Sequence, residues 1–275
     1  MKKLIALLMA MLMLVSLCSC GKDKDNQLGE QPGIIPDSTV EVEKDGEGIQ
    51  ADLDGDGADE TIKVEVVNDE LGYESGWKLV VESSDSSTST SFQNDGFLAK
   101  ANVIDLDSFD NLQEIVVTYD YASDNYATYI FRYVDGALTH TPEIWGKYTA
   151  ISDGIITVYY NVEVLGSTWN AYTTYKLGND FSLVRNDNMW YIESTEDDYL
   201  TTNTDIAITT EDDIVTTLPA GTRIVPVSSD LESIINIRTE DGTYGTISFS
   251  ISSGGQSVIG GQDVDEIIDD TQYAG

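Results

Sequence analysis

The sequence predicts a nearly all-β protein made of antiparallel strands, and two observations support this prediction. Short runs rich in β-branched and aromatic residues alternate with turn-forming pairs, and the 3.6-residue period of an amphipathic helix does not emerge. The main runs are Trp77–Val81, Ile115–Tyr119, Tyr126–Val134, Ile155–Tyr160, Trp169–Leu177, Ile206–Ile208, Arg223–Val227, Ile234–Arg238 and Thr243–Phe249. The turns include Asn94-Asp95-Gly96, Asp135-Gly136, Asp153-Gly154, Gly178-Asn179-Asp180 and Asp241-Gly242.

Residues 1–19 have the pattern of an export signal. A basic Met1-Lys2-Lys3 precedes the apolar run Leu4–Leu17, which is too short for a comfortable membrane span. The segment Leu17-Cys18-Ser19-Cys20 resembles the lipobox of bacterial lipoproteins. The resemblance implies cleavage before Cys20, a lipid on its sulfur, and anchoring to the outer face of the bacterial cell membrane, for which two acyl chains suffice. Plain secretion with a coincidental cysteine is the alternative.

Residues 20–40 are polar, contain Gly29, Pro32, Gly33 and Pro36, and lack hydrophobic periodicity. They predict a flexible tether between the anchor and the folded part. Both cysteines lie at or before Cys20, so the processed chain would have neither an internal disulfide nor a thiol nucleophile.

The most informative stretch is the acidic segment 52–60, near the start of a predicted β-meander domain at 41–195. Calcium prefers six to eight oxygen ligands, which loops supply from alternate carboxylates and a backbone carbonyl, with glycine at the sharp turn. Gly57 supplies that turn. The predicted ligands are the carboxylates of Asp52, Asp54, Asp56 and Glu60 and the carbonyl of Ala58. The alternative is a solvated acidic turn.

An EF-hand does not fit this segment, because its twelfth position is Lys63 and a β-like run follows where a helix would be needed. The pattern instead resembles the calcium loops of FG-GAP/VCBS-type propeller blades, in which the loop leads into a strand. The resemblance implies a structural Ca²⁺ ion, which we expect to bind weakly, as in many extracellular modules.

A weaker copy of the loop begins 53 residues later, and a β run follows it too. Its candidate ligands are Asp105, Asp107, Asp110 and Glu114, but it lacks the turn glycine and has one extra residue. A third unit, without an acidic loop, is predicted from Lys147 to Arg185. Three four-stranded units are too few to close a propeller, so either a curved open sheet or a packed sandwich is expected.

Residues 196–275 predict a second module. Leu218-Pro219-Ala220-Gly221-Thr222 and Asp241-Gly242-Thr243-Tyr244-Gly245 precede or join short β runs. These motifs resemble bacterial SH3-like domains, which implies a small barrel, and many members of that family bind cell-wall peptides or glycans. Thr246 replaces the tryptophan usual in that family, which weakens the case for wall binding. A hairpin insert and a short acidic helix are expected over 258–269.

The net charge of −35 argues against a nucleic-acid partner, since nucleic acids are bound through lysine and arginine. The only histidine, His140, has no thiol and no Gly-x-Ser-x-Gly elbow to act with. The sequence therefore predicts a non-catalytic surface protein that presents a β scaffold to a protein, peptide or cell-wall partner. A secreted glycan hydrolase with paired carboxylates is the alternative.

Overall fold

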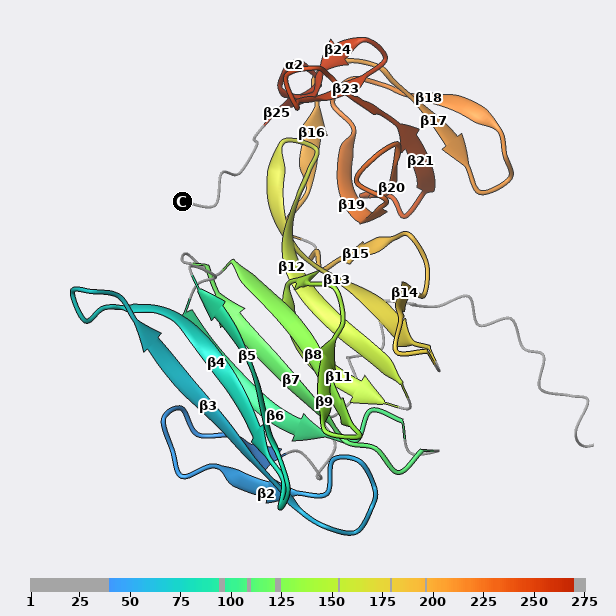
Figure 1. Ribbon diagram of the computed structural model, residues 1–275. Helices are drawn as coiled ribbons and strands as arrows, with labels where there is room; N and C mark the ends of the chain where they lie inside the picture. Colours follow the sequence, from blue (N-terminus) through green and yellow to red (C-terminus); the bar gives the residue numbers. More distant parts are fainter. Residues whose placement is uncertain are drawn as a thin grey trace, which may run out of the picture. The chain divides into compact units, whose positions relative to one another are not determined.

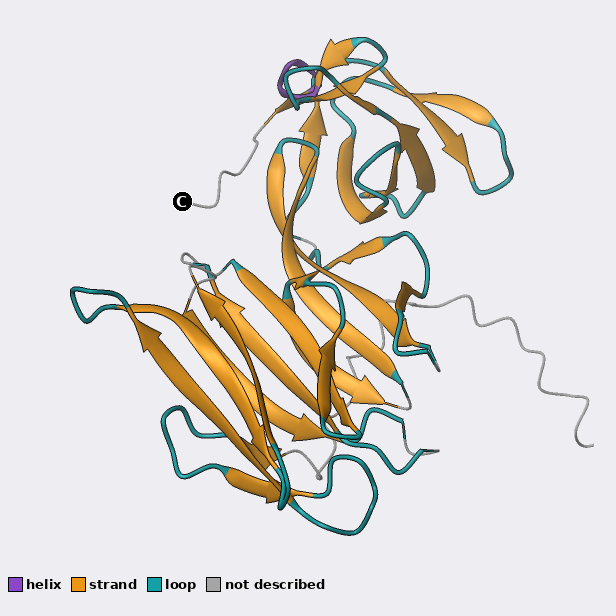
Figure 2. Cartoon of the chain, in the orientation of Figure 1, coloured by secondary structure: helices purple, strands orange, loops and turns teal. Residues whose placement is uncertain are grey.

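The computed structural model describes residues 40–93, 97–107, 110–121, 125–152, 154–178, 180–195 and 197–269. The predicted signal and Cys20 lie outside these residues. Within them nearly all regular structure is strand, apart from the single-turn helix α2 (Val264–Ile267) (Figure 2). No helix in this part of the chain is long and apolar enough to cross a membrane. All pairings between named strands are antiparallel, so the predicted all-β class is confirmed.

Three four-stranded meanders follow one another along the chain, as the sequence predicts (Figure 1). The first comprises β2 (Ile49–Ala51), β3 (Glu60–Asn68), β4 (Glu74–Glu82) and β5 (Ser87–Gln93). The second comprises β6 (Phe97–Ile104), β7 (Glu114–Asp120), β8 (Tyr126–Val134) and β9 (Ala137–His140), with β1 (Val40–Glu41) beside β6 and β10 (Ile144–Trp145) beside β8. The third comprises β11 (Lys147–Ser152), β12 (Ile155–Val164), β13 (Ser167–Leu177) and β14 (Leu183–Arg185).

Two hydrophobic cores join the meanders through the faces of their sheets. The first core combines residues of the first and second meanders, among them Trp77 and Phe131. The second core combines residues of the second and third meanders, among them Ile130 and Ile156. Because side chains alternate along a strand, neighbouring residues of β7 enter different cores. The meanders therefore pack as separate layers, and none of their sheets closes into a propeller among the described strands.

Hydrogen bonding continues from the third meander into the C-terminal part, because β15 (Trp190–Ile192) pairs with both β13 and β19. The other strands here are β16 (Leu200–Thr202), β17 (Ile206–Thr210), β18 (Val215–Leu218), β19 (Arg223–Ser229), β20 (Ile234–Thr239), β21 (Tyr244–Ser248), β22 (Ser250–Ile251), β23 (Ser257–Ile259), β24 (Gln262–Asp263) and β25 (Ile268–Asp269).

The SH3-like barrel is not confirmed. The strand order runs β15-β19-β20-β21-β17-β18 and ends at β18, so the described sheet is open. One edge of β19 is divided between β16 and β15, which extends the sheet where a barrel would close it. The predicted domain boundary at 195–196 falls between β15 and β16, and the pairing of β15 with β19 crosses it.

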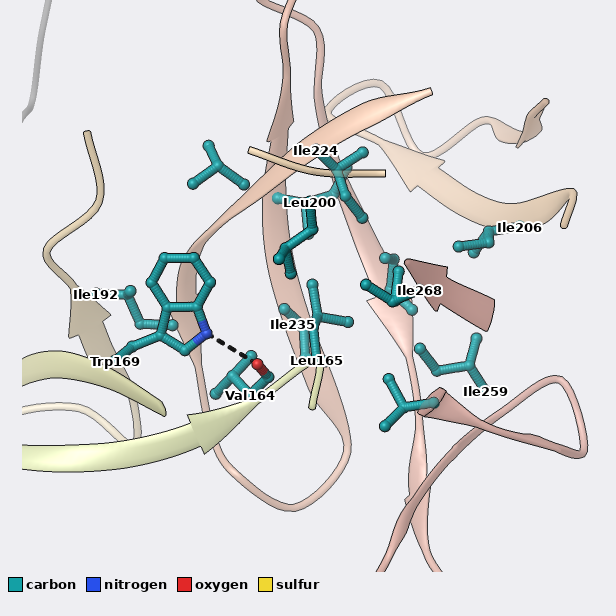
Figure 3. Packing of buried hydrophobic residues seen from close by; sticks show 14 of the residues in the cluster. Val164, Leu165, Trp169, Ile192, Leu200, Ile206, Ile224, Ile235, Ile259 and Ile268 are labelled. Carbon is teal, nitrogen blue, oxygen red and sulfur yellow. Dashed lines mark hydrogen bonds between the residues drawn. The ribbon is translucent and has the colours of Figure 1, made fainter. Parts of the chain in front are cut away.

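A third core lies between the β12–β13 hairpin and the C-terminal strands (Figure 3). Trp169 packs there and donates its indole N–H to the carbonyl of Val164 at 2.9 Å. The helix α2 buries Val264 and Ile267 in the same core. The short acidic helix expected in this segment is therefore present, with its acidic residues Asp265 and Glu266 exposed.

The loop between β19 and β20 is held by the carboxylate of Asp230, which accepts the N–H groups of Glu232, Ser233 and Ile234 at 2.8–3.0 Å. Burial alone would raise the pKa of Asp230, but these hydrogen bonds, together with one from the Ser233 hydroxyl, hold the pKa at about 2. A depressed pKa gives stability that is present above the ordinary aspartate pKa and lost as pH falls through about 2.

We therefore expect Asp230→Ala to lower the free energy of unfolding by about 1–3 kcal/mol at pH 7. The deficit should shrink as the pH is lowered from about 4 towards 2, because wild type then loses the same interaction. Urea denaturation across this range measures it, with the exposed Asp212→Ala as the control. A deficit that is constant with pH would contradict the role assigned to the charge.

Candidate metal centre

The first acidic loop joins β2 to β3 and gathers three carboxylates. One oxygen each from Asp52, Asp54 and Glu60 lies within 4.8 Å of the others. Gly57 has a φ of +89°, so the predicted turn glycine adopts a conformation that L side chains rarely take. Asp56, predicted as a ligand, lies outside this group and accepts the N–H of Ala58 at 2.7 Å. The structure thus assembles three of the four predicted carboxylates.

Asp52 has the most informative environment of the three. Its Oδ2 accepts the N–H of Gly57 at 3.0 Å, which folds the loop back on itself. Its Oδ1 is buried and has no hydrogen-bond partner among the described residues. A buried carboxylate oxygen without a donor is costly, so this atom is suited to contact a cation.

Glu60 is the buried member of the group, at 3% exposure, and begins β3. Its Oε2 accepts the N–H of Leu53 at 2.9 Å. Burial raises the pKa of Glu60, the Leu53 N–H opposes that rise, and the charges of Asp54, Asp56 and Asp52 add to it. None of the six ion pairs among the described residues involves Asp52, Asp54 or Glu60.

The second loop repeats this backbone arrangement. Glu114 begins β7, is fully buried, and accepts the N–H of Leu106 at 3.2 Å. Here, however, Arg132 on β8 lies opposite Glu114 and donates Nε to its Oε1 at 2.8 Å and Nη2 to the same oxygen. Nη2 also lies 3.5 Å from Asp110. Burial raises the pKa of Glu114, and the Arg132 guanidinium opposes the rise.

The two loops therefore differ in where their positive charge can come from. In the second loop a guanidinium occupies two of the four predicted ligands, Asp110 and Glu114. Arg132 is the residue opposite Glu114 on the neighbouring strand. In the first meander Thr61 is opposite Glu82, so the residue opposite Glu60 is the uncharged Ser83. Asp105 and Asp107 are half-buried, and residues 108–109 of that loop lie outside the description, so an ion there stays a prediction.

The sequence analysis missed Arg132 and the leucine near the start of each loop, Leu53 in the first and Leu106 in the second. Leu53 is fully buried in the first core, and its carbonyl accepts the N–H of Gln113 at 3.0 Å. Leu106 is fully buried in the second core, and its carbonyl accepts the N–H of Gly154. Each loop thus hydrogen-bonds its own meander through glutamate and the next meander through a carbonyl. The repeated Asp-Leu-Asp triplet was the signal for this role.

Comparisons with known protein families, with curated proteins and with solved structures found no match. The residues of the first loop indicate which kind of ion would suit it. All its converging donors are carboxylate oxygens, which suit a hard cation such as Ca²⁺, not the nitrogen or sulfur ligands typical of zinc. The buried Oδ1 of Asp52 fits the same requirement.

Proposed function

We propose that this protein is a non-catalytic, lipid-anchored surface protein whose β scaffold is stabilised by Ca²⁺ and presents an interaction surface to a partner. The observation that best supports a bound Ca²⁺ ion is the contrast between the two acidic loops. Where the second loop has Arg132, the first has carboxylates without an ion pair in the described chain. A divalent cation held by Asp52, Asp54 and Glu60 would supply the missing charge.

A structural role for the ion follows from the position of Leu53. This residue lies between the Asp52 and Asp54 ligands, fills the first core, and hydrogen-bonds Gln113 of the second loop. Fixing the loop therefore fixes the contact between two meanders. Calcium would act here on stability and would have no step in a reaction.

The surroundings of His140 support a non-catalytic role. Its ring contacts Phe92, Tyr129 and Phe131, with centroids 5.3–5.7 Å apart, and its Nδ1 lies 2.8 Å from the carbonyl of Thr141. Its hydrogen bond among the described residues is therefore to a backbone carbonyl, not to a hydroxyl nucleophile. The two buried glutamates, Glu60 and Glu114, each bind the backbone of their own loop, which gives them a structural role and not that of paired catalytic carboxylates.

Placement at the membrane surface rests on the lipobox-like segment at Cys20, and the acidic composition accords with it. A body with a net charge of −35 is repelled by anionic surfaces within a Debye length, so a tether at 20–40 would hold it away from the bilayer. The partner is proposed to be a protein, peptide or cell-wall component, and not a nucleic acid.

The metal proposal is tested by melting the protein with Ca²⁺ and with EDTA. Binding of about 10 mM Ca²⁺ with a Kd of about 0.1–1 mM would stabilise the fold by about 1.4–2.7 kcal/mol. For a domain of this size that corresponds to a rise in melting temperature of roughly 3–10 °C. Asp52→Asn should largely abolish the rise, since it removes the negative charge that attracts the cation and replaces one carboxylate oxygen with an amide nitrogen that cannot bind it.

Asp59→Asn is the matched control, because Asp59 is an exposed acid of the same loop outside the converging group. It should keep the Ca²⁺-dependent rise and differ little in EDTA. If wild type shows no rise and native mass spectrometry finds no bound Ca²⁺, the proposed structural ion is wrong.

A further inference from the structure

Three tyrosines form a continuous row across three adjacent strands of the third meander. Tyr159 on β12 is opposite Tyr172 on β13, and Tyr172 is opposite Tyr191 on β15. Their ring centroids are 5.6 and 5.4 Å apart, and the second pair is stacked at an interplanar angle of 24°. All three side chains are half-buried, so the row is accessible from one face of the sheet. We call these residues the tyrosine row.

A carboxylate lies at each end of the tyrosine row. The hydroxyl of Tyr159 donates to Glu193 at 2.7 Å, and the hydroxyl of Tyr191 donates to Asp187 at 2.6 Å. Neither carboxylate forms an ion pair in the described part of the chain. Because the protons of both hydroxyls are directed to carboxylates, the tyrosine row offers oxygen acceptors and electron-rich rings to a ligand.

The neighbouring cations are engaged elsewhere. Lys147 is opposite Tyr159 on β11, but its ammonium lies 5.3 Å from the ring of Tyr126. Arg185 lies 5.3 Å from the ring of Trp190 and donates to Thr173.

The negative charge of the two carboxylates reaches all three tyrosines. Hydrogen bonding to Asp187, followed by burial, raises the pKa of Tyr191 to about 12. Burial, followed by the charges of Glu193 and Asp187, raises the pKa of the central Tyr172.

We propose that the tyrosine row, with Asp187 and Glu193, binds lysine or arginine side chains of an extended peptide segment on a partner protein. This proposal rests on the proposed function, because it names the surface of the scaffold that binds a partner and the class of that partner. Guanidinium and ammonium groups are attracted both to tyrosine rings and to carboxylates, and arginine is enriched at protein interfaces. The exposed Asn161 and Asn170, paired on the same face, provide donors and acceptors for a peptide backbone.

The charge of the protein favours a basic peptide as the ligand of the tyrosine row over a neutral glycan. The chain as a whole has a net charge of −35, which steers a cationic partner towards it, and the row places two unpaired carboxylates at the point of contact.

The test uses a fluorescein-labelled octapeptide of alternating glycine and arginine, its glycine–glutamine counterpart, and an N-acetylglucosamine hexasaccharide. Binding to the mature protein is measured by anisotropy for the peptides and calorimetry for the sugar, in about 10 mM Ca²⁺. We expect only the arginine peptide to bind. Asp187→Asn with Glu193→Gln should weaken it about tenfold, and Tyr172→Leu should weaken it severalfold.

The control removes the same two charges elsewhere, as Glu211→Gln with Asp212→Asn in the exposed β17–β18 turn. An equal loss in both double variants would show diffuse attraction to an acidic surface and overturn the proposal. Binding of the hexasaccharide without the arginine peptide, or of neither probe, would overturn it too. Because the Ca²⁺-dependent melting shift is a separate readout, loss of that shift with retained peptide binding would count against the ion alone.

Discussion

Replacement of Arg132 by glutamine is expected to destabilise the protein by about 3–5 kcal/mol, because it leaves the carboxylate of Glu114 buried without its cation. The Glu114 side chain is fully buried and that of Arg132 is 12% exposed, so water screens the pair little. Arg132 also covers the ring of Phe181, with its guanidinium carbon 4.8 Å from the ring centroid. Urea denaturation at neutral pH measures the loss.

The loss should depend on pH in a defined direction. Burial already raises the pKa of Glu114, and without Arg132 the opposing charge is gone, so the pKa should rise further. A raised pKa gives stability that is complete below the ordinary glutamate pKa and lost as pH rises through the folded-state value. The Arg132→Gln variant should therefore be closest to wild type near pH 4–5 and furthest from it near pH 8.

Two controls separate this effect from loss of a surface charge. Arg223 pairs with Glu240 where both side chains are about half exposed, so Arg223→Gln should cost less than about 1 kcal/mol. The double variant Arg132→Met with Glu114→Leu removes both charges and should be more stable than Arg132→Gln alone. If Arg132→Gln behaved like Arg223→Gln, the second loop would not depend on an internal cation.

The strands and meanders were predictable from the sequence because their signals are local. Alternating β-branched residues and turn pairs specify a hairpin within about ten residues, and the predicted third unit, Lys147 to Arg185, coincides with β11–β14. The convergence of the Asp52 and Asp54 carboxylates was predictable for the same reason, since these residues lie two positions apart.

Contacts between strands were harder to predict. Arg132 reaches Glu114 across a ladder, 18 residues away, and its side chain gives no local sign of that partner. Asp56 matched the spacing of a ligand, but it lies outside the group of converging carboxylates, and its Oδ1 accepts the N–H of Ala58, as short acidic side chains often do in turns. The motifs that resemble an SH3-like barrel identify turns. Closure of the barrel, however, depends on which strand pairs with the edge of β19, and the residues of a single turn do not specify that pairing.

Replacement of Trp77 by alanine is expected to cost about 3–5 kcal/mol, as large cavities in closed cores do. Trp77 is fully buried on β4, stacks on Phe92 with centroids 4.3 Å apart, and meets Phe131 edge-on at 6.0 Å. Phe131 belongs to the second meander, so the cavity would open where two layers meet. Since domains are usually stable by only about 5–15 kcal/mol, the variant should melt well below wild type.

Trp145→Ala is the matched control for this substitution. Trp145 is 47% exposed and stacks on Tyr121 at the edge of its sheet, so its loss should leave little cavity and cost about 1 kcal/mol or less. Calorimetric melting of both variants in Ca²⁺ and in EDTA gives a further distinction. If the ion stabilises the contact between the layers, a cavity in the core that Leu53 and Trp77 share should reduce the Ca²⁺-dependent rise, whereas Trp145→Ala should leave it unchanged. An unchanged rise in Trp77→Ala would place the effect of the ion within its own loop and outside the contact between the layers.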